Sequence, residues 1–217
     1  MKFLRLCFFS LFIFISSSSF FFSASTDWVL QKNENGIAVY TRYQTGSSLK
    51  EIRVVNTVSS SLSGMVALLL DTKNYPKWIY ACRESKELKV VSEKELYNYQ
   101  ITDVPWPFSD RDVITHFTVQ QDSVTKIVTF TKTGVPDFIP AKDPLVRVQK
   151  FESVYRFIPL NKDSVQVVME MQLDPGGNIP AWLINANIVN APYQTTEAMV
   201  SQLPQYQSAS YSFIKEK

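Results

Sequence analysis

The chain has 217 residues with 22 basic and 20 acidic side chains, so its formal net charge is only +2. A charge this close to zero gives no electrostatic reason to expect nucleic acid as a partner. One histidine and two cysteines cannot supply the four ligands of a Cys/His metal cluster, so we expect neither a metal nor a cofactor.

The amino-terminal segment, residues 1–25, has the layout of a secretory signal peptide. Lys2 and Arg5 precede an apolar run at residues 6–15, and small residues follow before Thr26. We predict cleavage, with an uncleaved membrane anchor as the alternative. Cleavage leaves 20 basic and 20 acidic residues and one cysteine, which cannot form an intrachain disulfide. The mature protein is then expected in the periplasm or outside the cell.

The first part of the expected domain combines a short helix, a hairpin and a longer helix. Residues 26–32 are compatible with the short helix. Residues 36–43 and 49–58 are rich in β-branched and aromatic side chains and flank a T-G-S-S turn, which predicts a hairpin. Serines within residues 59–63 are good helix caps, and the apolar spacing that follows predicts a helix through Asp71.

A period of two residues dominates the middle of the chain. It predicts six strands, at residues 87–91, 96–104, 113–120, 124–131, 146–158 and 165–173. Short connections between successive strands favour antiparallel pairing, because parallel pairing needs long crossovers. With the hairpin, the sheet is expected to have about eight strands.

The stretch from Val104 to Asp112 reads V-P-W-P-F-S-D-R-D and forms a corner between two predicted strands. Pro105 and Pro107 lack the backbone donor that a sheet ladder requires, so they end the first strand. Trp106 and Phe108 are large and apolar, so we expect them to fold inward and cap a core.

Residues 133–144 contain three prolines, a glycine and two aspartates. This composition excludes a regular element. Long irregular loops in compact domains are often functional, so we expect this loop to form the rim of an opening.

The longest apolar stripe lies in residues 180–203, after a D-P-G-G-N stop, and predicts a C-terminal helix. Its members recur at steps of four and three: Trp182, Ala186, Val189, Tyr193, Thr196, Val200 and Leu203. Pro192 lies within it and should kink the helix, because it removes one backbone bond and crowds the preceding turn. Residues 206–217 are polar and are expected to form a loose tail.

A curved antiparallel sheet with one long amphipathic helix gives an α+β domain in which the helix buries its stripe on the concave face. The two surfaces either meet in a solid core or leave a dry cavity. Small residues in the helix (Ala181, Ala186, Ala191) and two flexible methionines, Met169 and Met171, on a facing strand favour a cavity.

Three segments resemble motifs of the START domain family. The segment P-W-P-F-S-D-R-D is similar to the family's P-W-P-x-S-x-R-D pattern, and residues 71–79, D-T-K-N-Y-P-K-W-I, resemble its D-x-x-x-Y-x-x-W segment. Residues 179–190, I-P-A-W-L-I-N-A-N-I-V-N, resemble the opening of its C-terminal helix. The resemblance implies a helix-grip domain over residues 26–205 in a secreted, bacterial-type member.

The resemblance also implies a function, which is to bind one lipid or other hydrophobic molecule and carry it to or from a membrane surface as a monomer. The expected lipid-binding residues are Tyr99, Phe117, Met169, Met171, Trp182, Leu183, Ala186, Val189 and Tyr193. One departure bears on the ligand. Several sterol-handling relatives have an arginine where this chain has Phe117 and an acid near the position of Asn98. A sterol held by such an ion pair is therefore in doubt.

Two other functions stay open. The first is a polyketide cyclase or dehydratase using the same cavity, with His116, Tyr99, Asp103 or Arg111 as acid and base. The second is a ligand-gated interaction module attached to a membrane.

Charged residues outside the stripe are assigned structural roles. We interpret Asp110, Arg111 and Asp112 as a structural ion pair. Arg147 is read as part of a solvated strand face.

Overall fold

The computed structural model describes residues 27–43 and 46–217. The predicted signal peptide, residues 1–25, lies outside the described residues. Among the described residues, no helix is long and apolar enough to cross a membrane.

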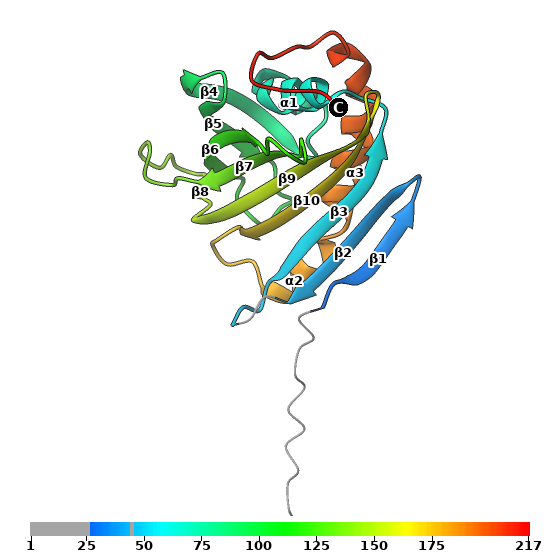
Figure 1. Cartoon of the computed structure of the whole chain (residues 1–217). Coiled ribbons are helices and arrows are strands. Elements are labelled where there is room, and N and C mark those ends of the chain that lie inside the picture. Colours follow the sequence, from blue (N-terminus) through cyan, green and yellow to red (C-terminus); the bar gives the residue numbers. More distant parts are fainter. Residues whose placement is uncertain (1–26, 44–45) are drawn as a thin grey trace, which may run out of the picture.

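A ten-stranded sheet forms most of the domain, with the order β1-β2-β3-β10-β9-β7-β6-β5-β4 and β8 beside β6 (Figure 1). Among the described strands, only the β6–β8 pair is parallel. The strands are β1 Val29–Glu34, β2 Ile37–Tyr43, β3 Lys50–Val58, β4 Cys82–Ser92, β5 Glu95–Thr102, β6 Arg111–Gln121, β7 Val128–Gly134, β8 Val146–Arg147, β9 Lys150–Asn161 and β10 Ser164–Asp174. The α+β class and the antiparallel sheet are confirmed, with two strands more than expected.

The helix expected at residues 26–32 is wrong. Val29–Glu34 is instead the edge strand β1, which pairs antiparallel with β2 from Val29 opposite Thr41 to Glu34 opposite Ile37. The pairing satisfies the outer edge of β2, and a short segment gains more from such a ladder than from an isolated helical turn.

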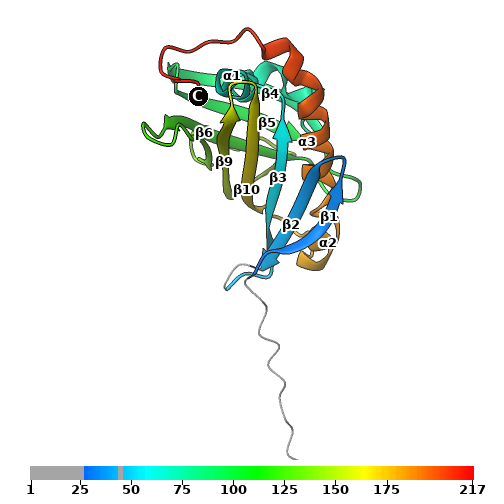
Figure 2. The same ribbon diagram turned by 45° about the vertical axis from the view of Figure 1, so that its right-hand side comes forward.

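In the part of the chain that the structure describes, five helical segments accompany the sheet: α1 Leu62–Leu70, η1 Thr72–Lys77, α2 Ala181–Asn187, α3 Asn190–Gln202 and η2 Leu203–Tyr206. The start of α1 follows the predicted serine cap, because the side chain of Ser61 accepts a 3.0 Å hydrogen bond from the backbone N–H of Gly64. Figures 1 and 2 show α3 lying across one face of the curved sheet, with α1 near one end of that face and α2 near the other.

The C-terminal helix is broken rather than merely kinked. α2 ends at Asn187 and α3 begins at Asn190, so that Pro192 is the third residue of α3. The first backbone N–H groups of a helix have no partner within it, so proline is tolerated at this position. Pro192 is therefore compatible with the first turn of a second helix.

Buried apolar residues form two clusters on the α3 side of the sheet and one on the opposite side. The largest joins α1 to β6, β7 and β9, and the second joins β2 and β3 to Tyr193 of α3. The third contains Tyr99, Ile101 and Ile114, packed against Val135, Ile139 and Leu145 of the loop after β7.

The end of the chain is packed, so the expectation of a loose tail is wrong. The hydroxyl of Tyr206 donates a 2.8 Å hydrogen bond to the carboxylate of Asp71. Ile214 is buried, and the carboxylate of Glu216 accepts hydrogen bonds from the backbone N–H groups of Leu62 and Ser63. The polar composition of this segment hides these contacts, because a single isoleucine, a few aromatic rings and a capping carboxylate hold it in place.

The corner between β5 and β6 also differs from the expectation, because its tryptophan points outward. Trp106 is 92% exposed, so it does not cap a core. Polar contacts hold the corner: the Asp110 carboxylate accepts a 3.0 Å hydrogen bond from the N–H of Val104 and pairs with Arg83. These contacts fix the two ends of the corner, and its tip, with Trp106, projects into solvent.

Candidate functional site

A mostly apolar pocket of about 280 Å³ lies between the sheet and α3. Its sheet wall comes from β5, β6, β7, β9 and β10, and its other walls come from η1, the segment before α2 and the start of α3. Lining residues include Tyr75, Val113, Thr115, Phe117, Lys132, Ser153, Tyr155, Met169, Met171, Ile179, Ala191, Pro192 and Thr195. Tyr80 also lines it and is 48% exposed, so this side of the pocket is near solvent.

A lysine, Lys132 on β7, contributes to the wall of this apolar pocket. In the sheet register it lies opposite Phe117 on one side and Ser153 on the other, and all three line the pocket. Lys132 is only 6% exposed. Its Nζ donates a 3.0 Å hydrogen bond to the hydroxyl of Tyr75, which itself donates to the carbonyl of Leu69.

Aromatic rings surround the amine of Lys132. The distance from Nζ to the ring centroid is 4.6 Å for Tyr75, 4.9 Å for Phe117, 5.4 Å for Tyr155 and 5.9 Å for Phe130. Ring faces attract the charged form of the amine. Burial opposes that charge and lowers the pKa of Lys132 from 10.5 to about 7.

The other titratable groups around this amine are held in their neutral forms. Burial raises the pKa of the Cys82 thiol to about 12 and that of the Tyr155 hydroxyl to about 12, and it also raises the pKa of Tyr75. The environment of Lys132 therefore contains no thiolate or phenolate at neutral pH.

Arg111 is the second basic residue of the pocket, at the start of β6. Its guanidinium donates to the backbone carbonyls of Ser109, Pro175 (3.4 Å) and Gly176 (3.1 Å). Burial lowers its pKa. Asp112 is the only acid among the described lining residues, and its carboxylate is bound by Arg147.

The structure brings three of the nine predicted binding residues into the pocket wall: Phe117, Met169 and Met171. Their strands present alternate residues to the α3 side, as the period-two pattern predicts. The other six do not line the pocket. Tyr193 and Val189 pack against β2 and β3 beside it.

Trp182, Leu183 and Ala186 belong to α2, a helix with no buried residue, and lie outside the pocket. The break before α3 separates their stripe from that of α3. Tyr99 lies on the other face of the sheet, because Gln100 and Thr102 are the β5 residues that face the pocket.

Sequence reasoning missed Lys132, Tyr75 and Tyr155. A usable signal was present for Lys132: in V-T-F-T-K, apolar Val128 and Phe130 alternate with threonines, and the same period puts Lys132 on their buried face. Tyr75 lies in η1 and reaches the pocket only through tertiary packing.

The acid and base candidates of the enzymatic alternative do not meet in the pocket. His116 lies 2.8 Å from the carboxylate of Glu95 and stacks on Tyr97. None of these three residues lines the pocket. Asp103 pairs with Arg83 at the surface. Of the four candidates, only Arg111 lines the pocket.

The loop at residues 133–144 was expected to form the rim of an opening, but none of its residues lines this pocket. Part of the loop covers the third apolar cluster on the opposite face. Arg147 holds it there by donating to the carbonyls of Pro136, Ile139 (2.9 Å) and Pro140 (3.2 Å). Arg147 is thus buried, and its assignment to a solvated strand face is wrong.

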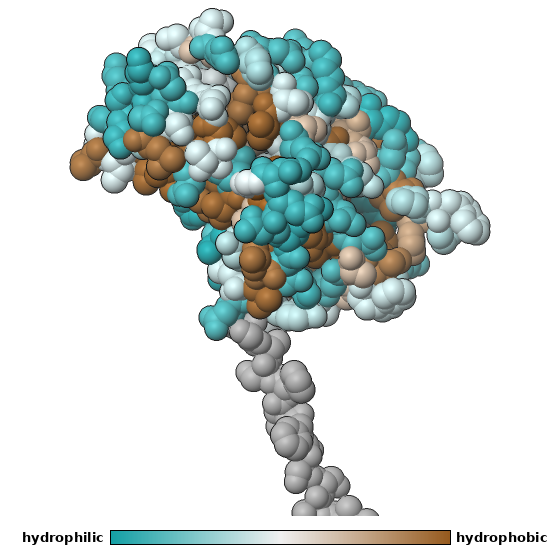
Figure 3. Space-filling model, turned by 90° about the vertical axis from the view of Figure 1, so that its right-hand side faces the viewer, coloured by the Kyte–Doolittle hydropathy of each residue, from teal (hydrophilic) through white to brown (hydrophobic). Residues whose placement is uncertain are grey.

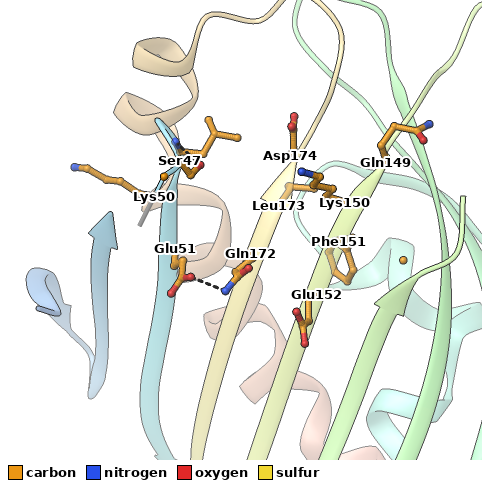
Figure 4. A pocket seen from close by; sticks show the side chains of 13 residues that line it. Ser47, Lys50, Glu51, Gln149, Lys150, Phe151, Glu152, Gln172, Leu173 and Asp174 are labelled. Atoms are coloured by element: carbon orange, nitrogen blue, oxygen red, sulfur yellow. Dashed lines mark hydrogen bonds between the residues drawn. The ribbon is translucent and has the colours of Figure 1, made fainter. Parts of the chain in front are cut away.

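A second hollow, of about 530 Å³, is polar and open (Figure 4). Figure 4 shows Glu51, Gln172 and Glu152 projecting from three neighbouring strands, with Glu51 bonded to Gln172. Arg42 pairs with Glu51 at 2.7 Å. This polar, open lining does not suit an apolar ligand, so we assign the candidate site to the pocket beside α3.

Comparison with known proteins agrees with this fold. The START domain family model matches residues 22–204. The chain belongs to the START domain family. It is 33% identical to an uncharacterised protein of Pseudomonas aeruginosa over 81% of this chain and 86% of that protein. It is 26% identical to the phosphatidylcholine transfer protein of Rattus norvegicus over 83% of this chain and 85% of that protein.

Solved structures of other proteins show the same fold. A StAR-related lipid transfer protein from Xanthomonas axonopodis superimposes with a TM-score of 0.77 at 33% identity, covering 82% of this chain and 99% of that one. An aromatase/cyclase from a Streptomyces species superimposes with a TM-score of 0.50 at 10% identity, covering 71% and 93%. The latter similarity concerns the fold alone.

Proposed function

We propose that this START domain protein binds one lipid, or a similar apolar molecule, in the pocket beside α3 and carries it as a monomer. The observation that carries the proposal is the mostly apolar pocket of about 280 Å³ beneath α3. Apolar pockets of this kind bind apolar guests, and each buried methylene contributes about 0.8 kcal/mol. The relationship to phosphatidylcholine transfer proteins supports lipid as the class of ligand.

Entry to the pocket requires a local opening, and the contacts of α3 suggest where it occurs. Ala191, Pro192 and Thr195 of α3 line the pocket, and Thr195 accepts a 3.0 Å hydrogen bond from the N–H of Tyr80. No side-chain capping bond holds the start of either α2 or α3. We propose that α2 and the first turn of α3 move away from Tyr80 at a membrane surface.

Exposed aromatic and aliphatic residues fit a transient membrane contact. Trp106 is 92% exposed at the β5–β6 corner and Trp182 is 70% exposed on α2, and Val104 and Ile179, near each of them in sequence, line the pocket. Tryptophan favours the interface between lipid and water. On the face drawn in Figure 3, apolar residues form separate patches among hydrophilic ones, which is compatible with reversible attachment.

A pair of substitutions on one helix tests the proposal. Ala191→Trp places a large ring at the pocket wall, whereas Gln194→Trp adds the same ring at an exposed position of α3. Delipidated protein should take up a fluorescent phospholipid or fatty acid with saturation. We expect Ala191→Trp to lower the affinity at least about tenfold and Gln194→Trp to leave it unchanged. No saturable uptake of any lipid by the unmodified protein would exclude the function.

The enzymatic alternative receives less support from the site. His116 and Tyr99 lie away from the pocket, so they do not provide an acid and base for a bound polyketide. Turnover of an aromatic polyketide precursor by the purified protein would favour this alternative over carriage.

Export is proposed from the sequence of residues 1–25. Amino-terminal sequencing of the protein from its native host distinguishes cleavage near residue 25 from retention as an anchor.

A further inference from the structure

The amine of Lys132 has more N–H donors than there are acceptors bonded to it. An ammonium group carries three donors, and the one hydrogen bond that the structure gives Nζ is to the hydroxyl of Tyr75. No described carboxylate forms an ion pair with it; Asp112, the only acidic lining residue described, is already bound through two hydrogen bonds of 2.9 Å to Arg147. Lys132 is thus a buried amine whose charged form has no counter-charge among the described residues.

Its neighbours direct the amine toward the ligand space. Phe117 and Ser153 flank Lys132 on the adjacent strands and line the pocket with it. Ser153 is only 2% exposed and carries a small hydroxyl, so it leaves room beside the amine. The faces of the aromatic rings on the remaining sides attract a cation but supply no anionic oxygen to pair with it.

We propose that Lys132 binds the acidic head group of a single-chain amphiphile, such as a fatty acid, which enters the pocket head first. This inference rests on the proposed function and specifies its ligand. A carboxylate beside Nζ would supply the missing counter-charge and accept charge-assisted hydrogen bonds from the amine. The acyl chain would then extend along Met169, Met171 and Ile179 toward α3.

The size of the pocket favours one chain over two. At about 280 Å³ it lies just below the usual range for ligand pockets, roughly 300–1,000 Å³. A two-chain phospholipid needs a much larger space. A charged amine head group would be repelled by Arg111 and by the protonated form of Lys132, and an alcohol would accept a hydrogen bond but supply no counter-charge.

Three probes of equal chain length test the head group: hexadecanoic acid, hexadecanol and hexadecylamine. Their affinities are measured at pH 7 by displacement of a fluorescent fatty acid from delipidated protein. We expect the acid to bind at least about tenfold more tightly than the alcohol, and the amine to bind most weakly.

Lys132→Met removes the charge while keeping an unbranched apolar side chain, and Lys89→Met removes an exposed lysine of β4 as the control. We expect Lys132→Met to lose the preference for acid over alcohol and Lys89→Met to keep it. Lys132→Gln is the second variant if Lys132→Met fails to fold, with folding checked by circular dichroism.

Equal affinities for acid and alcohol in the unmodified protein, or an acid preference that survives in Lys132→Met, would overturn the inference and leave lipid carriage intact. Saturable binding of phosphatidylcholine without binding of any single-chain probe would also overturn the inference and leave lipid carriage intact. Failure to bind any of these lipids would instead remove the proposed function.

Discussion

Arg147 holds the carboxylate of Asp112 with two hydrogen bonds of 2.9 Å, from Nε to Oδ1 and from Nη2 to Oδ2. The exposed fractions of the two side chains are 5% and 0%. The pair joins β6 to β8 and fixes the loop that covers the outer face of the sheet. It also explains why Asp112 is not free to neutralise Arg111 or Lys132 in the pocket.

Substitution of Arg147 by methionine should destabilise the domain strongly. Asp112 would remain as an unpaired buried charge, which costs roughly 3–5 kcal/mol. Denaturation in urea measures the free energy of unfolding. The matched control is Arg156→Met, which breaks a partly exposed 3.4 Å pair with Glu170 on the same sheet and should cost under about 1 kcal/mol. Similar losses in both variants would contradict the assignment of a buried structural pair.

The burial of Lys132 predicts a specific dependence of stability on pH. Its pKa falls from 10.5 to about 7 on folding, so between these values the unfolded chain binds more protons than the folded one. The free energy of unfolding should therefore rise with pH in this window, by at most about 1.4 kcal/mol per pH unit, and the contribution is lost as the pH falls to about 7.

The measurement is best confined to pH 7 through about 8.5. Tyr75, Tyr155 and Cys82 also face the amine, and burial raises the pKa of each of them, so they lower stability at more alkaline pH. Arg111, the other cation of the pocket, stays charged throughout this range. Lys132→Met should abolish most of the rise in stability; an identical slope in the variant would show that another group causes it.

Glu216 should stabilise α1 although it lies near the end of the chain. Its carboxylate accepts 2.9 Å hydrogen bonds from the N–H groups of Leu62 and Ser63, which have no partner within the helix. Glu216→Ala should lower the free energy of unfolding by about 1 kcal/mol. Glu93→Ala, at an exposed turn between β4 and β5, serves as the control and should have little effect. Equal stability of the two variants would mean that water replaces the carboxylate without cost.

Trp106 and Trp182 should contribute to membrane attachment. Replacing either by alanine removes an exposed ring and should weaken binding to phospholipid vesicles by about tenfold, which corresponds to about 1.4 kcal/mol of lost apolar contact. Val124→Ala is the control, because Val124 is 85% exposed in the turn at the other end of β6. Sedimentation with vesicles compares the variants. A larger loss for Val124→Ala would place the contact surface at that other end.

Several elements could be predicted because their signals are local. The alternation in β10 placed Val167 and Met169 on the buried face, and the serine before α1 marked its start. Short connections favoured the antiparallel pairing that the sheet shows. The motifs around Trp106 and Ile179 indicated the family correctly, although the orientation expected for Trp106 was wrong.

The binding residues expected on the C-terminal helix were less well placed. A single helix over residues 180–203 would have aligned Trp182 and Tyr193 on one face, but the break at residues 188–189 separates them. Tyr99 was expected in the pocket, whereas its neighbour Gln100 lines it. Adjacent residues of a strand face opposite ways, so an error of one position moves a side chain across the sheet.

By itself, the sequence determined the α+β class, the antiparallel connectivity, most of the strands and the family, because periodicity, caps and motifs depend on residues close together in the chain. Only the tertiary structure decided that Lys132, Phe117, Ser153 and Tyr75 line the same pocket. It also decided that Arg147 forms an ion pair with Asp112 and that Trp106 faces solvent. These relationships join residues distant in sequence, and they arise from strand register and packing, which set the neighbours of each side chain.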